Sequence, residues 1–157
     1  MNYLIQFIVA MTATVAVAIL FATPKKELLF CGLSGAISWI VYYVVDEKSG
    51  NTVAACLAAT FILTVFSRAL AVLRKNPATI YLLSGIFTLV PGAGVYYTVY
   101  YLISGDRAQF ASKGLETFEI ALAIVFGIIF GFAIPEALFH RHTHGKQAKR
   151  DADSQKL

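Results

Sequence analysis

Residues Thr88–Ser104 read TLVPGAGVYYTVYYLIS, an apolar run with a Pro-Gly-Ala-Gly cluster and two tyrosine pairs. The run belongs to a longer apolar stretch, residues 78–103, whose 26 residues would form a helix about 39 Å long. That exceeds a hydrocarbon core of about 30 Å. Pro91 removes a helical hydrogen bond and disfavours helical geometry at Val90. We therefore expect a fourth helix that is kinked or broken at Pro91-Gly92.

Composition indicates a membrane protein. The 157 residues are 58% hydrophobic and 14% charged, with a mean hydropathy of +0.69, whereas soluble domains carry about 25% charged residues. The apolar runs are continuous and lack the alternation of barrel strands. The sequence therefore predicts an all-α bundle of five transmembrane helices, at about 3–22, 28–45, 52–73, 78–103 and 115–135.

The chain divides into a transmembrane domain, residues 1–139, and a polar, basic tail, residues 140–157. The first span lacks a basic leader, so we expect it to be retained. Lys and Arg number nine in the connections and tail on one side and three on the other. The positive-inside rule then places the N-terminus outside and the C-terminus in the cytoplasm. We expect the membrane to be a bacterial inner membrane.

The net charge of +4 lies mostly in the tail, which predicts attraction to anionic membrane lipid rather than to nucleic acid. Cys31 and Cys56 lie inside spans, as expected for small core residues. His140, His142 and His144 alternate in the tail, but no further ligand pattern accompanies them. We therefore predict no metal and no cofactor.

Small residues recur every fourth position in the fifth span. Ala123, Gly127 and Gly131 share one face, and Glu119 begins the same column. Membrane helices approach one another closely through such faces. We expect this face to pack against another helix.

Arg68 lies near the cytoplasmic end of the third span, with Thr60 and Thr64 before it on the same face. Two interpretations are open. The guanidinium can extend to the inner headgroups, or the three residues can line a polar path in which Arg68 meets a carboxylate of a substrate or of another helix.

Glu116 and Glu119 are also open to two interpretations. They stand one turn apart at the start of the fifth span. If they face the bundle, partial burial makes them a coupling or cation site. If they face solvent, they are first-turn acids favoured by the helix dipole.

The break itself predicts a binding site. Pro91 suits the first turn of a new helix, and the amides exposed there, around Gly92 and Gly94, would bind a carboxylate. Tyr96 and Tyr97 follow on adjacent faces and could line a passage. The alternative is a proline kink with interfacial tyrosines.

The segment FSRALAVLRKNPATIYLLSGIFTLVPGAGVYYTVYYLISGD, residues 66–106, together with GLSGAISW and AIVFGIIFG, resembles the small five-span subunit of the threonine/serine exporter family. This subunit corresponds to the C-terminal half of fused members and is similar to the small subunit of a two-component succinate exporter. The resemblance covers nearly the whole chain except the tail.

The resemblance implies export of threonine, serine or a succinate-like dicarboxylate. It also implies a larger partner subunit with a cytoplasmic N-terminal region. The motif positions carry over as Arg68, Pro77, Pro91, Gly92 and Tyr96.

The leading hypothesis is thus a secondary-transporter subunit exporting small carboxylate-bearing metabolites, driven by the proton gradient. The alternative is a non-transporting assembly or regulatory subunit, and a homo-oligomer is compatible with either. The spans lack paired metal ligands or a nucleophile with its base, so an enzyme is not predicted.

Overall fold

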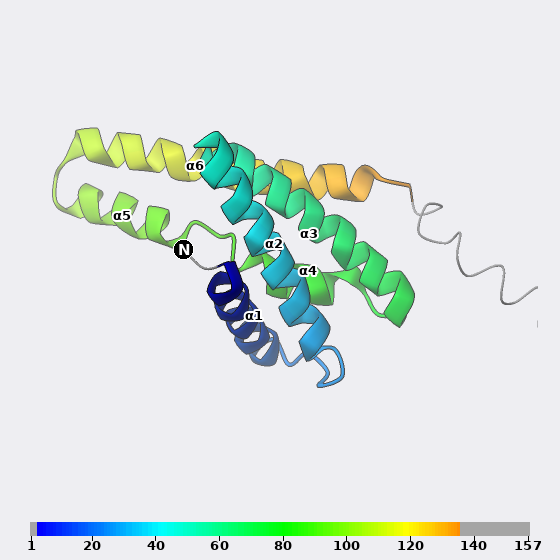
Figure 1. The fold of residues 1–157 in the computed structure, drawn as a ribbon. Coiled ribbons are helices and arrows are strands. Elements are labelled where there is room, and N and C mark those ends of the chain that lie inside the picture. The colour runs from blue at the N-terminus through cyan, green and yellow to red at the C-terminus, as the bar shows by residue number, and fades with distance from the viewer. Residues whose placement is uncertain (1–2, 136–157) are drawn as a thin grey trace, which may run out of the picture.

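The computed structural model describes residues 3–135, which form six α-helices (Figure 1). The second helix packs against the first, third and fourth, and the sixth packs along the third and fifth. The predicted tail, with its three histidines, lies outside the described residues. The helices are α1 Tyr3–Leu20, α2 Leu28–Ser49, α3 Thr52–Arg74, α4 Ala78–Ile86, α5 Gly92–Ile103 and α6 Arg107–Ala133.

Capping residues set three helix boundaries, two of which an apolar run does not reveal. The helix α2 continues through Asp46–Ser49 and ends at Gly50, where φ is +61°. The Asn51 side chain then accepts from the amides of Val53 and Ala54, 3.1 Å away, and starts α3. The helix α6 begins eight residues before the predicted span, because Asp106 caps it through the Gln109 amide.

The predicted 78–103 span is two separate helices. Between α4 and α5, the Val90 amide still donates to Ile86 O, and the Gly92 amide donates back to Val90 O at 2.8 Å. Pro91 has φ −76° and ψ 61°, the geometry of an inverse γ-turn. The break is thus a turn, and the prediction of five spans with a kinked fourth helix is not confirmed.

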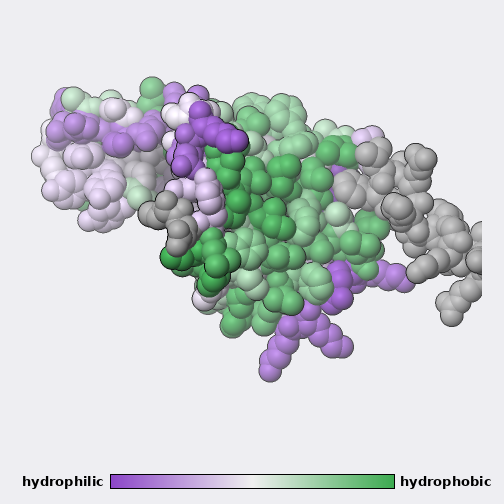
Figure 2. All heavy atoms as spheres, viewed as in Figure 1, coloured by the Kyte–Doolittle hydropathy of each residue, from purple (hydrophilic) through white to green (hydrophobic). Residues whose placement is uncertain are grey.

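Among the described helices, α1, α2, α3 and α6 are long and apolar enough to cross a membrane. The helices α4 and α5, with 9 and 12 residues, fall short of the roughly 20 that a span needs. Figure 2 shows a largely hydrophobic surface over the body of the bundle, with hydrophilic residues gathered towards its ends.

The helices approach one another through paired glycines and threonines. A Cβ at Gly127 or Gly131 would lie 2.8 or 2.5 Å from the Cβ of Thr60 or Thr64. Both threonine hydroxyls donate to a carbonyl one turn earlier on α3, which satisfies the hydroxyl within its own helix. The predicted packing face of α6 is therefore confirmed, and its partner is α3.

These contacts fix the direction of α6. Along α3, Thr60 faces Gly127 and Thr64 faces Gly131, so the two helices run parallel. The first residues of α6 therefore extend past the start of α3, by roughly 18 Å at 1.5 Å per residue. With α5 they form a hairpin that reaches away from the other helices (Figure 1).

An ion pair between buried Glu27 and exposed Arg74 joins three segments at the opposite end of the bundle. Glu27, 5% exposed, accepts from Arg74 Nη2 at 2.9 Å and Nε at 3.1 Å, and from Tyr81 Oη at 2.7 Å. The Arg74 guanidinium also lies 4.4 Å from the ring centre of Phe30. Bidentate geometry makes such pairs specific, so this cluster fixes the α1–α2 connection against α3 and α4.

Glu27→Gln is expected to reduce the acid sensitivity of the fold. Hydrogen bonds from Arg74 and then Tyr81 lower the pKa of Glu27. Its contribution to stability is therefore present above the ordinary carboxyl pKa of about 4.3 and is lost as pH falls through the lowered value. The midpoint of thermal unfolding should fall less between pH 7 and pH 3 in the variant than in the wild type.

Glu116→Gln is the matched control, because Glu116 is exposed and pairs only at the surface with Lys113. Equal pH dependence in the wild type and Glu27→Gln would contradict the role given to Glu27.

Candidate functional site

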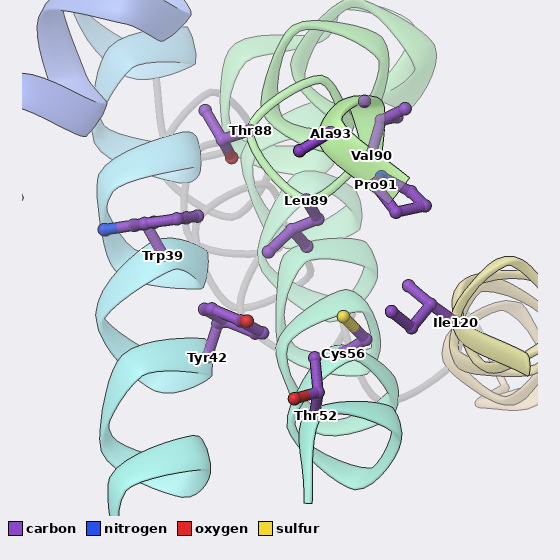
Figure 3. A pocket seen from close by; sticks show the side chains of 11 residues that line it. Trp39, Tyr42, Thr52, Cys56, Thr88, Leu89, Val90, Pro91, Ala93 and Ile120 are labelled. Atoms are coloured by element: carbon purple, nitrogen blue, oxygen red, sulfur yellow. The ribbon is translucent and has the colours of Figure 1, made fainter. Parts of the chain in front are cut away.

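A cavity of about 270 Å³ lies beside the break between α4 and α5 (Figure 3). Four elements surround it: α2, α3, α6 and the segment that turns from α4 into α5. The break thus borders a half-open space lined by protein, which is where irregular backbone is tolerated in a membrane protein. The lining residues are Trp39, Tyr42, Thr52, Cys56, Thr88, Leu89, Val90, Pro91, Gly92, Ala93 and Ile120.

The start of α5 borders this cavity at Gly92 and Ala93. Gly92 and Val95 donate to Val90 O and Pro91 O, whereas no described residue accepts from the amides of Ala93 and Gly94. Pro91 offers no capping side chain. Free first-turn amides and the positive end of the helix dipole favour an anionic group. The arrangement suits a carboxylate.

The remaining walls are mostly apolar and carry no charged side chain. Tyr42, Thr52, Cys56 and Thr88 contribute hydroxyl and thiol groups, and no lining residue is acidic or basic. Thr88 already donates to Gly85 O at 2.7 Å. The cavity therefore has a few placed polar groups on an apolar surface, which is typical of small-molecule sites.

A second cavity of about 180 Å³ shares Trp39 and Thr88 with the first. Its other walls come from α1, and the indole of Trp39 donates to Gln6 Oε1 at 2.9 Å. Trp39 and Thr88 thus separate two spaces. The Gln6–Trp39 hydrogen bond holds this partition in place.

Of the residues predicted to form a site at the break, the structure places only some at the cavity. Pro91 and Gly92 line the cavity. Gly94 packs on α6, where a Cβ would lie 2.5 Å from Thr117 Oγ1. Tyr96 and Tyr97, 64% and 48% exposed, do not line the cavity. Their rings stack on those of the tyrosines one turn later, along the outer surface of α5.

Arg68 lies away from the cavity, 12 residues along α3 from Cys56, or about 18 Å. Its guanidinium donates to the carbonyls of Gly131, Phe132 and Ile134 at 2.8, 3.1 and 2.6 Å. It is 7% exposed, so it does not extend to solvent. The structure gives Arg68 the role of binding the C-terminal end of α6.

Thr60 and Thr64 are fully buried against the glycines of α6. They form a helix-packing stripe in this structure. Glu116 and Glu119 are both exposed on α6, and Glu116 accepts from Lys113 Nζ at 2.7 Å. Neither belongs to the cavity lining. A pathway role for the threonines and a coupling role for the acids stay predictions.

Sequence reasoning missed the lining residues that come from α2, α3 and α6, namely Trp39, Tyr42, Thr52, Cys56 and Ile120. Cys56 was expected only as a small core residue. Trp39 and Tyr42 lie three residues apart on α2, and Thr52 and Cys56 lie four apart on α3, so each pair shares one helix face. Nothing in the sequence shows that these two faces meet beside the break. No group of three metal-binding side chains occurs in the described residues.

Helices of this length and hydropathy define a multi-pass membrane protein. Residues 6–134 match the model of the family described as Threonine/Serine exporter, ThrE. The chain therefore belongs to the threonine/serine exporter family, a family of transporters, which are generally not enzymes. Searches of curated proteins and of solved structures gave no significant match.

Proposed function

We infer that the chain is a subunit of a secondary transporter that exports small carboxylate-bearing metabolites, either threonine and serine or a succinate-like dicarboxylate. The observation that carries this proposal is the cavity at the α4–α5 break, where the amides of Ala93 and Gly94 have no acceptor among the described residues. Family membership supports transport, and the break supplies a binding site for a carboxylate.

The hairpin of α5 and the first half of α6 supports a partner subunit. No residue of α5 is buried, although most of its surface is aromatic or aliphatic. Large exposed apolar surfaces commonly mark interfaces with protein or lipid. A larger member of the same family, with a cytoplasmic N-terminal region, is the partner we propose.

The arrangement of the connections is compatible with the proposed orientation. The ion pair between Glu27 and Arg74 holds the α1–α2 connection beside the end of α3. Lys25, Lys26 and Lys75 thus lie in segments at one end of the bundle. A cytoplasmic position of this end follows the positive-inside rule, and puts the N-terminus outside the bacterial inner membrane.

Ala93→Trp is expected to abolish export by filling the mouth of the cavity. Ala93 is exposed and lines the cavity at the first turn of α5, so the indole can enter it without repacking the core. The measurement is efflux of labelled serine, threonine and succinate from cells that express the chain with and without the larger subunit. Efflux should fall to the level of cells that lack the chain.

The control is Ala16→Trp, which adds the same ring to an exposed alanine of α1 that lines neither cavity and lies outside the α5–α6 hairpin. Normal efflux in Ala93→Trp would rule out this cavity as the pathway. No efflux of any of the three substrates in the wild-type complex would favour the assembly or regulatory role instead.

A further inference from the structure

A line of small polar side chains runs along the interface between α2 and α4. Cys31, Ser34 and Ser38 recur at three- and four-residue spacing on one face of α2, and each is at most 1% exposed. Cys31 Sγ donates to Ile80 O at 3.7 Å, and Ser34 Oγ donates to Tyr81 O at 3.3 Å, both on α4. The two helices thus meet through hydroxyl and thiol groups as well as through apolar side chains.

This interface joins two polar regions of the bundle. On α2 the same face continues to Tyr42, which lines the cavity. On α4 it runs from Tyr81 through buried Ser84 to Thr88, a further lining residue just past the end of the helix. At its other end the interface reaches Glu27, which accepts from Tyr81 Oη. A buried polar path therefore connects the cavity with the end of the bundle for which we propose a cytoplasmic position.

Ser67 on α3 faces this path. Leu63, four residues earlier, lies against Gly85 of α4, and Leu70, three residues later, packs with Cys31, so Ser67 lies between these contacts on the same face. It is 1% exposed, and its hydroxyl has no hydrogen-bond partner among the described residues. A buried hydroxyl without a partner costs about 1–3 kcal/mol. Packing alone would be served by alanine here, whereas a polar solute passing this point would give the hydroxyl a partner.

We propose that the interface between α2 and α4 is the route by which solute reaches the cavity from the cytoplasm, and that Glu27 keeps its entrance closed in this structure. The Glu27 carboxylate accepts from Arg74 at the end of α3 and from Tyr81 in the first turns of α4. Loss of these contacts frees the start of α4 to move away from α2. The inference rests on the proposed function and adds the inner half of its pathway.

The accessibility of introduced cysteines tests the route. Ser67→Cys exchanges one atom, and Thr64→Cys is the matched control, because Thr64 is equally buried on α3 but faces Gly131 of α6. Both are made in the full chain with Cys31→Ser and Cys56→Ser, and expressed with the larger subunit. Inside-out membrane vesicles are then treated with a membrane-impermeant thiosulfonate. Ser67→Cys should react about tenfold faster than Thr64→Cys, because only the first lies where the bundle opens locally.

Glu27→Gln tests the entrance. It should raise the reaction rate of Ser67→Cys about tenfold, as expected for weakening one hydrogen bond to a charged group, and leave that of Thr64→Cys unchanged. Glu47→Gln is the control, since this carboxylate accepts from Tyr3 Oη at the other end of the bundle. The proposal would be overturned by equal rates at the two cysteines, by an unchanged rate in Glu27→Gln, or by reaction of Ser67→Cys from the outer face only.

Efflux decides the proposed function separately. Complete modification of Ser67→Cys should stop efflux of whichever of serine, threonine and succinate the unmodified complex exports. Efflux that continues after complete modification would retain the transporter and reject this route. A reactive Ser67→Cys in a complex that exports none of the three would retain the route and reject the proposed substrates.

Discussion

Arg68→Met is expected to lower the free energy of unfolding by about 3 kcal/mol and to detach the C-terminal end of α6 from α3. Methionine keeps an unbranched chain in the same space but has no donor. The carbonyls of Gly131, Phe132 and Ile134 would then lose the guanidinium in apolar surroundings. Unsatisfied buried polar groups are costly there, and the negative end of the α6 dipole would also lose a cation.

Lysine tests the geometry of the same contact. Arg68→Lys keeps the charge but replaces the planar fork of donors with a single ammonium, so its stability should lie between those of the wild type and Arg68→Met. Thermal unfolding can be followed with a thiol-reactive dye, because Cys31 and Cys56 are both buried and become reactive only when the bundle opens.

The control is Arg107→Met, the same change at the exposed first residue of α6. It should alter stability by less than about 0.5 kcal/mol. If Arg68→Met unfolded at the wild-type temperature, the buried contacts to α6 would contribute nothing. A loss of export in Arg68→Met together with this destabilisation would reflect a displaced α6 rather than a lost substrate contact.

Local chemistry made parts of this fold predictable. Proline at position 91, followed by two glycines, dictates a break wherever the surrounding chain goes. The four-residue spacing of Gly127 and Gly131 likewise marks a packing face within one helix. Both features depend on residues a few positions apart, which is the range over which a single sequence carries structural information.

The cavity could not be predicted in the same way, since its walls come from segments far apart in the chain. Cys56 and Pro91 meet only because α3, α4 and α6 pack as they do. The polar start of α6 was missed for a different reason: hydropathy finds apolar runs, while the helix begins at a cap, Asp106, that precedes polar helix-forming residues. Arg68 was left between two interpretations, the inner headgroups and a polar path, because a sequence does not show which carbonyls a guanidinium will reach.

The glycine contacts lead to the second large effect. Gly35→Ala and Gly127→Ala are each expected to destabilise the bundle by about 2–3 kcal/mol through overpacking. At Gly35, the new Cβ would lie 2.0 Å from Thr14 Oγ1 and 2.8 Å from its Cβ. At Gly127, it would lie 2.9 Å from the backbone oxygen of Leu57, as well as against Thr60.

The clash at Gly35 involves only side-chain atoms, whereas the clash at Gly127 also involves backbone atoms. This difference predicts which clash a second substitution can relieve. At Gly35 the three nearest atoms all belong to the Thr14 side chain, so Thr14→Gly removes them and should restore most of the stability lost in Gly35→Ala, apart from the usual cost of about 1 kcal/mol for a glycine within a helix. Thr60→Gly cannot rescue Gly127→Ala, because the backbone of α3 remains in the way.

Gly92→Ala serves as the control, since no atom lies within 4 Å of its added Cβ. All variants are compared by thiol-dye unfolding midpoints in the same detergent. Equal rescue at both sites would mean that α6 shifts along α3 to accommodate the methyl group, and that the close approach at Gly127 is not required. Rescue at Gly35 alone would show that the backbone contact between α3 and α6 sets the position of Ile120, and with it one wall of the cavity.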